Sequence, residues 1–168
     1  MIFVCPLSKV AETVSSSGAR RLVSLLNAEN EVVRPAAIAP EHHLLLSMND
    51  IAEAQAGLTL PGEMHVRQLL DFATEWDRVR PLVIHCYAGI SRSTASAYIV
   101  ASALSPQRDE VELAKELRWL SPSATPNPRL IAVADALLGR EGRMIAAIKA
   151  IGRGADAFEG APFALEIS

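Results

Sequence analysis

Residues 82–94 read LVIHCYAGISRST, and this stretch decides which fold we expect. Its first three residues form a fully apolar run that is rich in β-branched side chains, which is typical of a central strand in a parallel sheet. A compact turn with Gly89 follows from Cys86 to Arg92, and an Ala-rich helical segment covers residues 93–103. The order of strand, tight loop and helix predicts one unit of a layered α/β protein.

The rest of the chain extends this pattern. Apolar runs at 2–5, 21–26 and 43–48 predict three further strands. Residues 27–40 contain two prolines and are expected to form a loop or an edge strand. Apolar spacing and capping residues predict helices at 9–17, 61–80, 109–119, 130–138 and 144–151. We therefore expect an α/β fold in which a mainly parallel sheet of four or five strands is flanked by helices.

Length and composition indicate one globular domain. Of the 168 residues, 50% are hydrophobic and 21% are charged, which excludes a disordered chain. We expect this domain to span residues 1–152. Residues 153–168 are expected to be a C-terminal tail, which packs either on the domain or on a partner.

The charge of the chain excludes some classes of function. A net charge of −3 and a pI of about 5.8 argue against a broad electrostatic contact with nucleic acid or with an acidic membrane. The N-terminus lacks the basic region of a signal peptide, and no apolar stretch approaches the ~20 residues of a membrane span. We expect a cytoplasmic protein, and 27 Ala with 13 Arg against 3 Lys favour a bacterial source with a GC-rich genome.

The turn after the central strand has the features of an anion-binding cradle. A loop that enters a helix N-terminus directs successive backbone N–H groups inward, and the helix dipole adds positive potential. Glycine at position 89 allows the backbone to approach an anion closely. The N–H groups expected to bind a phosphoryl group belong to Tyr87, Ala88, Gly89, Ile90, Ser91 and Arg92.

Two reactive side chains lie at the two ends of this turn. The positive potential favours the thiolate form of Cys86, which is the nucleophilic form. Arg92 can bind two phosphoryl oxygens with its planar guanidinium and can offset charge in the transition state. Ser93 can donate its hydroxyl to the Cys86 sulfur and so help the thiolate leave. The turn thus predicts nucleophilic attack on phosphorus without a metal or an organic cofactor.

The sequence His85-Cys86-x5-Arg92-Ser93 resembles the signature of the cysteine-dependent protein tyrosine phosphatase superfamily, and it is most similar to the compact dual-specificity branch. The stretch with Arg118, Pro122 and Pro126-Asn127 also matches that branch, and the likeness covers about residues 48–138. The resemblance implies that Asn127 hydrogen-bonds the phosphate loop and that His85 orders the loop or tunes the thiolate. Ser121 stands where the family usually has Arg, so the contact of that Arg is not expected here.

The resemblance further implies a general acid on a loop that follows a strand before the cysteine. Asp50 fits, because it follows the 43–48 strand and lies 36 residues before Cys86, and Glu53 is the alternative. The implied activity is hydrolysis of phosphomonoesters through a phosphocysteine intermediate. The expected substrates are phosphotyrosine, and also phosphoserine or phosphothreonine, in proteins or in small phosphomonoesters.

Other functions stay open at this point. A non-catalytic module would keep Cys86 and Arg92 as a receptor for a phosphorylated partner. A phosphatase of phosphoinositides, nucleotides or RNA ends would use the same loop, although the neutral Tyr87, Ala88 and Ile90 argue against a polyanionic lipid. Loops with a thiolate and an arginine also act on sulfur compounds and on arsenate.

The remaining reactive and aromatic side chains are expected to be structural. Cys5 lies in the first predicted strand as a small core residue, and a disulfide with Cys86 would need their Cα atoms within ~7 Å. Trp76 and Trp119 have apolar neighbours at helical spacing and are expected in the core. No metal-ligand spacing is found among the histidines, which are His42, His43, His65 and His85.

Overall fold

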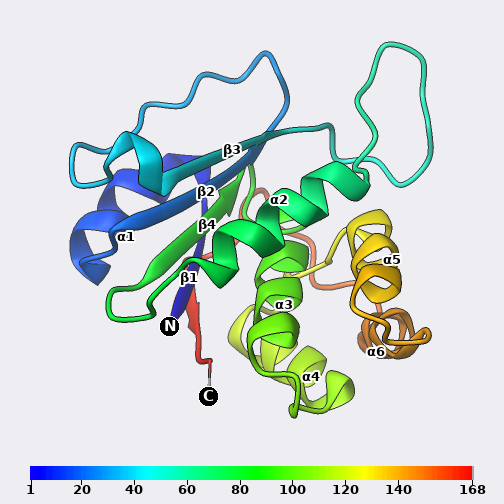
Figure 1. Cartoon of the computed structure of the whole chain (residues 1–168). Helices are drawn as coiled ribbons and strands as arrows, with labels where there is room; N and C mark the ends of the chain where they lie inside the picture. Colours follow the sequence, from blue (N-terminus) through cyan, green and yellow to red (C-terminus); the bar gives the residue numbers. More distant parts are fainter. Residues whose placement is uncertain (168) are drawn as a thin grey trace.

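A five-stranded sheet forms the centre of the computed structural model, which describes residues 1–167 (Figure 1). The strand order is β3-β2-β4-β1-β5. Strands β1 to β4 run parallel, and β5 pairs antiparallel with β1. The strand bounds are β1 (Ile2–Pro6), β2 (Arg21–Leu26), β3 (His43–Ser47), β4 (Leu82–Cys86) and β5 (Phe163–Leu165). The α/β fold with a mainly parallel sheet, predicted from the sequence, is confirmed.

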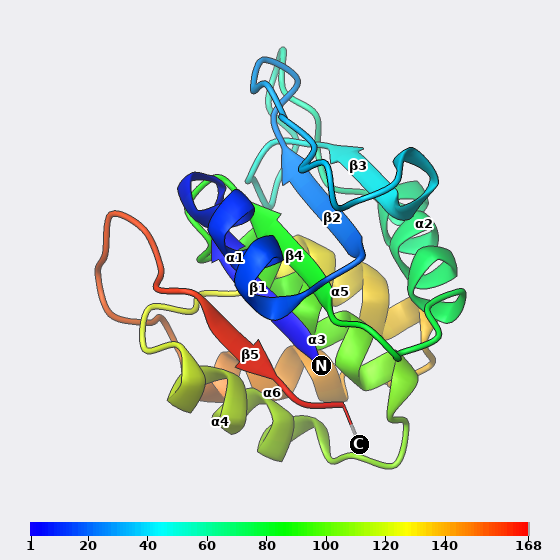
Figure 2. The same ribbon diagram turned by 90° about the vertical axis from the view of Figure 1, so that its left-hand side faces the viewer.

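Helices cover both faces of the sheet (Figure 2). On one face, α1 (Val10–Ser17) packs against side chains of β1, β2 and β4. On the other face, α2 and α3 lie next to the sheet, α4 and α5 pack against α3, and α6 packs against α4 and α5. The bounds of these helices are α2 (Glu63–Thr74), α3 (Arg92–Leu104), α4 (Glu110–Leu120), α5 (Pro128–Leu137) and α6 (Arg143–Ile151).

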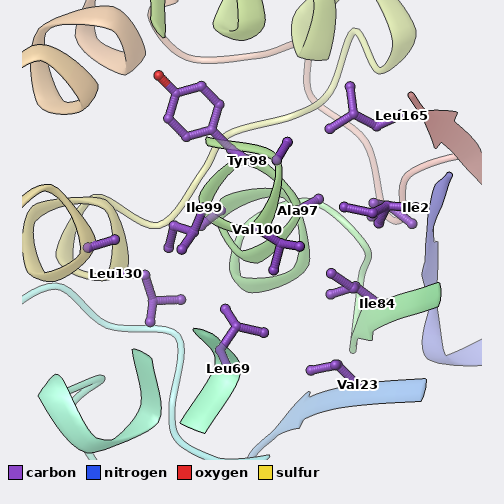
Figure 3. Close-up of a cluster of buried hydrophobic side chains, with 14 of the residues drawn as sticks. Ile2, Val23, Leu69, Ile84, Ala97, Tyr98, Ile99, Val100, Leu130 and Leu165 are labelled. Carbon is purple, nitrogen blue, oxygen red and sulfur yellow. The ribbon is translucent and has the colours of Figure 1, made fainter. Parts of the chain in front are cut away.

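Helix α3 is the central element of the larger core. Every residue from Arg92 to Ser102 is buried, so the helix has no solvent face. Small residues such as Ala97 allow α3 to lie close to the sheet. Figure 3 shows Ala97 facing Ile2 of β1, while Ile99 faces Leu130 of α5. This packing fixes the N-terminus of α3 directly behind the carboxyl end of β4.

The C-terminal segment packs on the domain, which answers a question that the sequence left open. Its strand β5 extends the sheet, with Phe163 opposite Val4 and Leu165 opposite Ile2. The sequence analysis missed β5 because three residues are too few to show an alternating pattern. None of the described helices is long and apolar enough to cross a membrane.

The structure confirms two of the expected core residues and contradicts a third. Trp76 and Cys5 are buried, but Trp119 of α4 is 81% exposed. The buried side of α4 carries Leu113 and Leu117, and a residue two positions after Leu117 lies about 200° further round the helix. The prediction for Trp119 was wrong because apolar neighbours in the sequence do not define the buried face of a helix.

Candidate active site

The β4–α3 loop (residues 87–91) connects the carboxyl end of β4 with the N-terminus of α3. Gly89 has φ +70°, a region that side chains disfavour. A Cβ atom at this position would lie 2.7 Å from the backbone nitrogen of Pro6 and 2.8 Å from the carbonyl carbon of Cys5. Both contacts are shorter than real Cβ contacts, so only glycine fits where the loop crosses the end of β1.

Backbone carbonyls of the loop are held by segments that are distant in sequence. Leu7 N–H donates to the Tyr87 carbonyl (N···O 3.1 Å), and Gly160 N–H donates to the Ala88 carbonyl (2.8 Å). Two further carbonyls of the loop accept from the Pro-rich connector before α5, as Thr125 N–H donates to Ile90 and Asn127 N–H to Ser91.

The N–H groups of the same loop are unpaired. Within residues 1–167, none of the backbone N–H groups of residues 87–92 donates a hydrogen bond to another residue. Unpaired N–H groups before a helix N-terminus form a concentrated positive site that an anion can fill. The loop therefore has the polarity of an anion cradle, with its acceptors bound by the protein and its donors free.

Cys86 lies at the start of this cradle, as the last residue of β4. Its Sγ atom lies 3.1 Å from the Oγ atom of Ser93 in the first turn of α3, and both side chains are buried. The short contact requires both the tight loop and the fixed α3 N-terminus. A hydroxyl at this distance can donate to a thiolate and stabilise it as a leaving group.

Arg92 forms hydrogen bonds with the residues that directly follow two other strands. Its Nη1 atom donates to the Asn27 Oδ1 atom after β2 (2.9 Å) and to the Met48 carbonyl after β3 (2.7 Å). The residue is only 5% exposed, and its Nε atom is buried without a partner among the described residues. A buried guanidinium N–H without an acceptor is costly unless an anion occupies the site.

Sequence analysis missed the role of Asn27. Because the carboxyl ends of parallel strands meet at one edge of a sheet, a polar residue directly after the 21–26 strand was a candidate for the site.

Asp50 lies at the rim of the cradle. Its Oδ1 atom accepts hydrogen bonds from Ser91 Oγ and from Asn127 Nδ2, each at 2.8 Å. These two donors orient the carboxyl group, and both bind Oδ1 and not Oδ2. Glu53, the alternative acid, is an exposed residue of the same loop, and no hydrogen bond joins it to the β4–α3 loop among the described residues.

The side chain of Asn127 positions the Asp50 loop. Its Nδ2 atom donates to Asp50 and also to the Ile51 carbonyl (3.2 Å), while its Oδ1 atom accepts from Leu130 N–H and caps α5. The expected hydrogen bond between Asn127 and the phosphate loop is made by its backbone, because Asn127 N–H donates to the Ser91 carbonyl (3.2 Å).

A buried hydrogen-bond chain lies behind Cys86. The Ser24 Oγ atom lies between two histidine Nε2 atoms, at 2.6 Å from His85 and 2.9 Å from His43. The His85 Nδ1 atom lies 3.4 Å from the Cys86 carbonyl, which can only accept, so Nδ1 carries the proton. A neutral His85 then accepts from Ser24, and Ser24 accepts from His43. This chain orients the end of β4, and sequence analysis found only His85.

Burial controls the protonation of both histidines. The pKa of His85 is lowered to about 4, mainly by burial, with the Cys86 carbonyl partly opposing the shift and the nearby His43 and Arg92 adding to it. Burial, followed by the charge of Arg34, also lowers the pKa of His43. His85 is therefore neutral at physiological pH, as the direction of the hydrogen-bond chain requires.

Cys5 lies behind the sheet relative to Cys86. The register pairs Cys5 with His85, so its side chain projects to the α1 face, while Cys86 belongs to the core cluster on the α3 face. Both thiols are free, and burial raises the pKa of Cys5 to about 11. Opposite faces and an unreactive neutral thiol argue against a disulfide between the two cysteines.

Similar solved structures support the fold but share little sequence with this chain. Searches of family models and of curated proteins find no match. DUSP15 is 15% identical, with 89% of this chain and 90% of that chain covered and a TM-score of 0.62. The human tyrosine phosphatase-like serine/threonine/tyrosine-interacting protein is 13% identical, with 83% and 92% covered and a TM-score of 0.63. PTPMT1 in complex with PI(5)P is 13% identical, with 90% and 94% covered and a TM-score of 0.63.

These matches show a fold similar to that of dual-specificity and tyrosine-phosphatase-like proteins. At this level of identity they show the fold alone. Activity and substrate have to be argued from the site itself.

The low pKa of His85 predicts that acid destabilises the protein. The unfolded chain binds a proton at this histidine near its ordinary pKa of 6.5, whereas the folded chain binds it only near about 4. The contribution of His85 to stability is therefore nearly constant above about pH 7 and is lost as the pH falls from 6.5 toward 4. Between neutral pH and pH 5 this loss is about 2 kcal/mol for a single group.

Urea unfolding at a series of pH values measures this loss. In His85→Gln, which keeps a hydrogen-bonding side chain but cannot titrate, the slope of stability against pH should be smaller across this range. An identical slope in the variant would show that His85 does not titrate as derived.

Proposed function

We propose that this chain is a phosphomonoester hydrolase that forms a phosphocysteine intermediate on Cys86. Its proposed substrates are phosphotyrosine residues of proteins, with phosphoserine and phosphothreonine as further candidates. The main support is the contact between Cys86 Sγ and Ser93 Oγ beside a loop with unpaired N–H groups and next to the unpartnered Arg92 Nε. Nucleophile, anion cradle and charge-neutralising group thus occupy one site.

In the first step the Cys86 thiolate attacks phosphorus, an S–P bond forms and the bond to the leaving oxygen breaks. The N–H groups of residues 87–92 and the Arg92 guanidinium bind the phosphoryl oxygens, whose charge is largest in the transition state. Asp50 donates a proton from Oδ2 to the leaving oxygen, since Oδ1 is occupied by Ser91 and Asn127.

The second step hydrolyses the intermediate. Water attacks phosphorus while Asp50, now a carboxylate, accepts a proton from it. The S–P bond breaks, and Ser93 donates a hydrogen bond to the departing thiolate at the observed 3.1 Å. Free phosphate leaves, and Cys86 returns to its starting form.

A phosphate-binding module without turnover is the main alternative. One of the similar structures is a protein described only as tyrosine phosphatase-like, so the fold alone does not decide between the two functions. The presence of Cys86, Ser93 and Asp50 in hydrogen-bonded positions favours catalysis, because a receptor needs only the cradle and Arg92.

Hydrolysis of p-nitrophenyl phosphate by Cys86→Ser tests the proposal. Serine lacks a nucleophilic anion at neutral pH, so turnover should be lost while orthovanadate still binds. Cys5→Ser is the matched control, since it changes the other buried cysteine on the opposite face of the sheet and should keep activity. Metal chelators should have no effect on the wild type. Wild-type turnover in Cys86→Ser would contradict the covalent mechanism, and orthovanadate binding without any wild-type turnover would favour the binding module.

A second prediction concerns the general acid. Asp50→Ala should lower kcat by about 10²–10⁴ because the leaving oxygen is no longer protonated. The loss should be larger with phenyl phosphate than with p-nitrophenyl phosphate, whose leaving group needs less protonation. This dependence distinguishes proton donation from a purely structural role of Asp50.

Glu53→Ala is the control from the same loop and should leave kcat unchanged for both substrates. A fall in Glu53→Ala with normal kcat in Asp50→Ala would transfer the role of acid to Glu53.

A further inference from the structure

Two hollows on one side of the β4–α3 loop meet at Leu7 and Ser8. One has a volume of about 230 Å³ and lies between these residues, Tyr87, Phe158 and Glu159. The other, of about 340 Å³, continues from the same residues toward the loop after β2. Its further lining residues are Val10, Ala11, Glu31, Val32, Val33, Pro35 and His85. We call these two hollows together the lateral groove.

The lateral groove exposes large apolar side chains beside the catalytic loop. Phe158 is 90% exposed, Val33 85% and Tyr87 53%. Phe158 and Tyr87 line the first hollow and Val33 lines the second. Large apolar side chains gathered along one groove indicate a binding surface, whereas scattered exposed apolar residues do not. Tyr87 directly follows Cys86 in the chain, so the groove begins at the proposed active site.

The Phe158 wall of the groove is anchored. The next residue, Glu159, accepts a hydrogen bond from Ser8 Oγ (2.8 Å), and Gly160 N–H binds the Ala88 carbonyl (2.8 Å). A Cβ atom on Gly160 would lie 2.8 Å from the Gly89 carbonyl oxygen, so the segment packs tightly on the catalytic loop. Phe158 is thus presented to solvent by a fixed backbone, which lowers the entropy cost of binding.

The charge of the groove distinguishes between ligand classes. Its charged lining residues are acidic, Glu31 and Glu159, and among residues 1–167 no lysine or arginine lines either hollow. A nearby basic side chain, Lys9, interacts electrostatically with Glu159 but forms its ion pair with Glu12. The negative charge of Glu31 and Glu159 repels an anionic lipid surface and attracts basic side chains. The hollow on the other side of the loop is different, because it is lined by Asp50, Ser91 and the ion pair of Arg153 with Asp156.

We propose that the lateral groove binds the polypeptide that flanks the phosphorylated residue, and that it selects large apolar side chains accompanied by Lys or Arg. This inference rests on the proposed phosphatase function and specifies its substrate class. An extended peptide advances about 3.3 Å per residue, so a phosphotyrosine in the cradle places side chains a few residues away into the adjoining groove. Phe158 and Tyr87 would cover an apolar side chain, and Glu31 and Glu159 would pair with the basic one.

Three phosphotyrosine peptides of equal length test the inference, one with Leu and Arg flanks, one with Ser and one with Glu flanks. We expect kcat/KM to be about tenfold higher for the Leu–Arg peptide than for the Ser peptide, and lowest for the Glu peptide. In Phe158→Ala the ratio between the Leu–Arg and Ser peptides should fall toward one. Trp119→Ala removes another highly exposed aromatic side chain, which lies on α4, and it should keep the wild-type ratio.

Other results would overturn the inference. Equal kcat/KM for the three peptides, or an unchanged ratio in Phe158→Ala, would show that the groove does not select the flanks. Faster turnover of phosphoinositide in anionic vesicles, or a dimer that Phe158→Ala dissociates, would assign the surface to lipid or to a second copy. If the wild-type protein does not hydrolyse p-nitrophenyl phosphate, only the proposed phosphatase function is contradicted. The groove would still be tested by comparing the affinities of the three peptides, measured by fluorescence anisotropy.

Discussion

The polarity of the β4–α3 loop is the constraint on which the rest of the site depends. Four of its carbonyls are bound by N–H groups from Leu7, Thr125, Asn127 and Gly160, while its own N–H groups have no partner among residues 1–167. The donors come from the turn after β1, the connector before α5 and the C-terminal segment. The conformation of the loop is thus held by parts of the chain that are distant from it in sequence.

The buried helix α3 and the arginine at its start complete this arrangement. Because α3 packs on all sides, its N-terminus cannot move away from β4, and Cys86 stays within hydrogen-bond distance of Ser93. Arg92 uses one nitrogen to hold Asn27 and Met48. The position of the Asp50 loop therefore depends on the same guanidinium that is expected to bind phosphate, which couples anion binding to the proposed acid.

Local sequence patterns predicted most of the strands and helices and the loop at the centre of the site. They could not predict contacts between segments that are distant in sequence. The loop from Cys86 to Arg92 is continuous in sequence, so its residue types alone indicate the chemistry. The partners of Asp50, the Ser24 chain behind His85 and the strand β5 depend on how distant segments meet. The prediction that Trp119 is buried was wrong for a related reason, since only packing defines which face of α4 is buried.

Direct detection of the covalent intermediate tests the central claim most sharply. Rapid acid quench of Asp50→Ala during turnover of p-nitrophenyl phosphate, whose leaving group needs little protonation, should give one phosphoryl group on the peptide that contains Cys86, detected by peptide mass spectrometry. The proposed mechanism predicts that this adduct accumulates, because loss of the base slows hydrolysis of the intermediate. Turnover without any adduct on Cys86, or an adduct on Cys5 instead, would contradict nucleophilic catalysis by this residue.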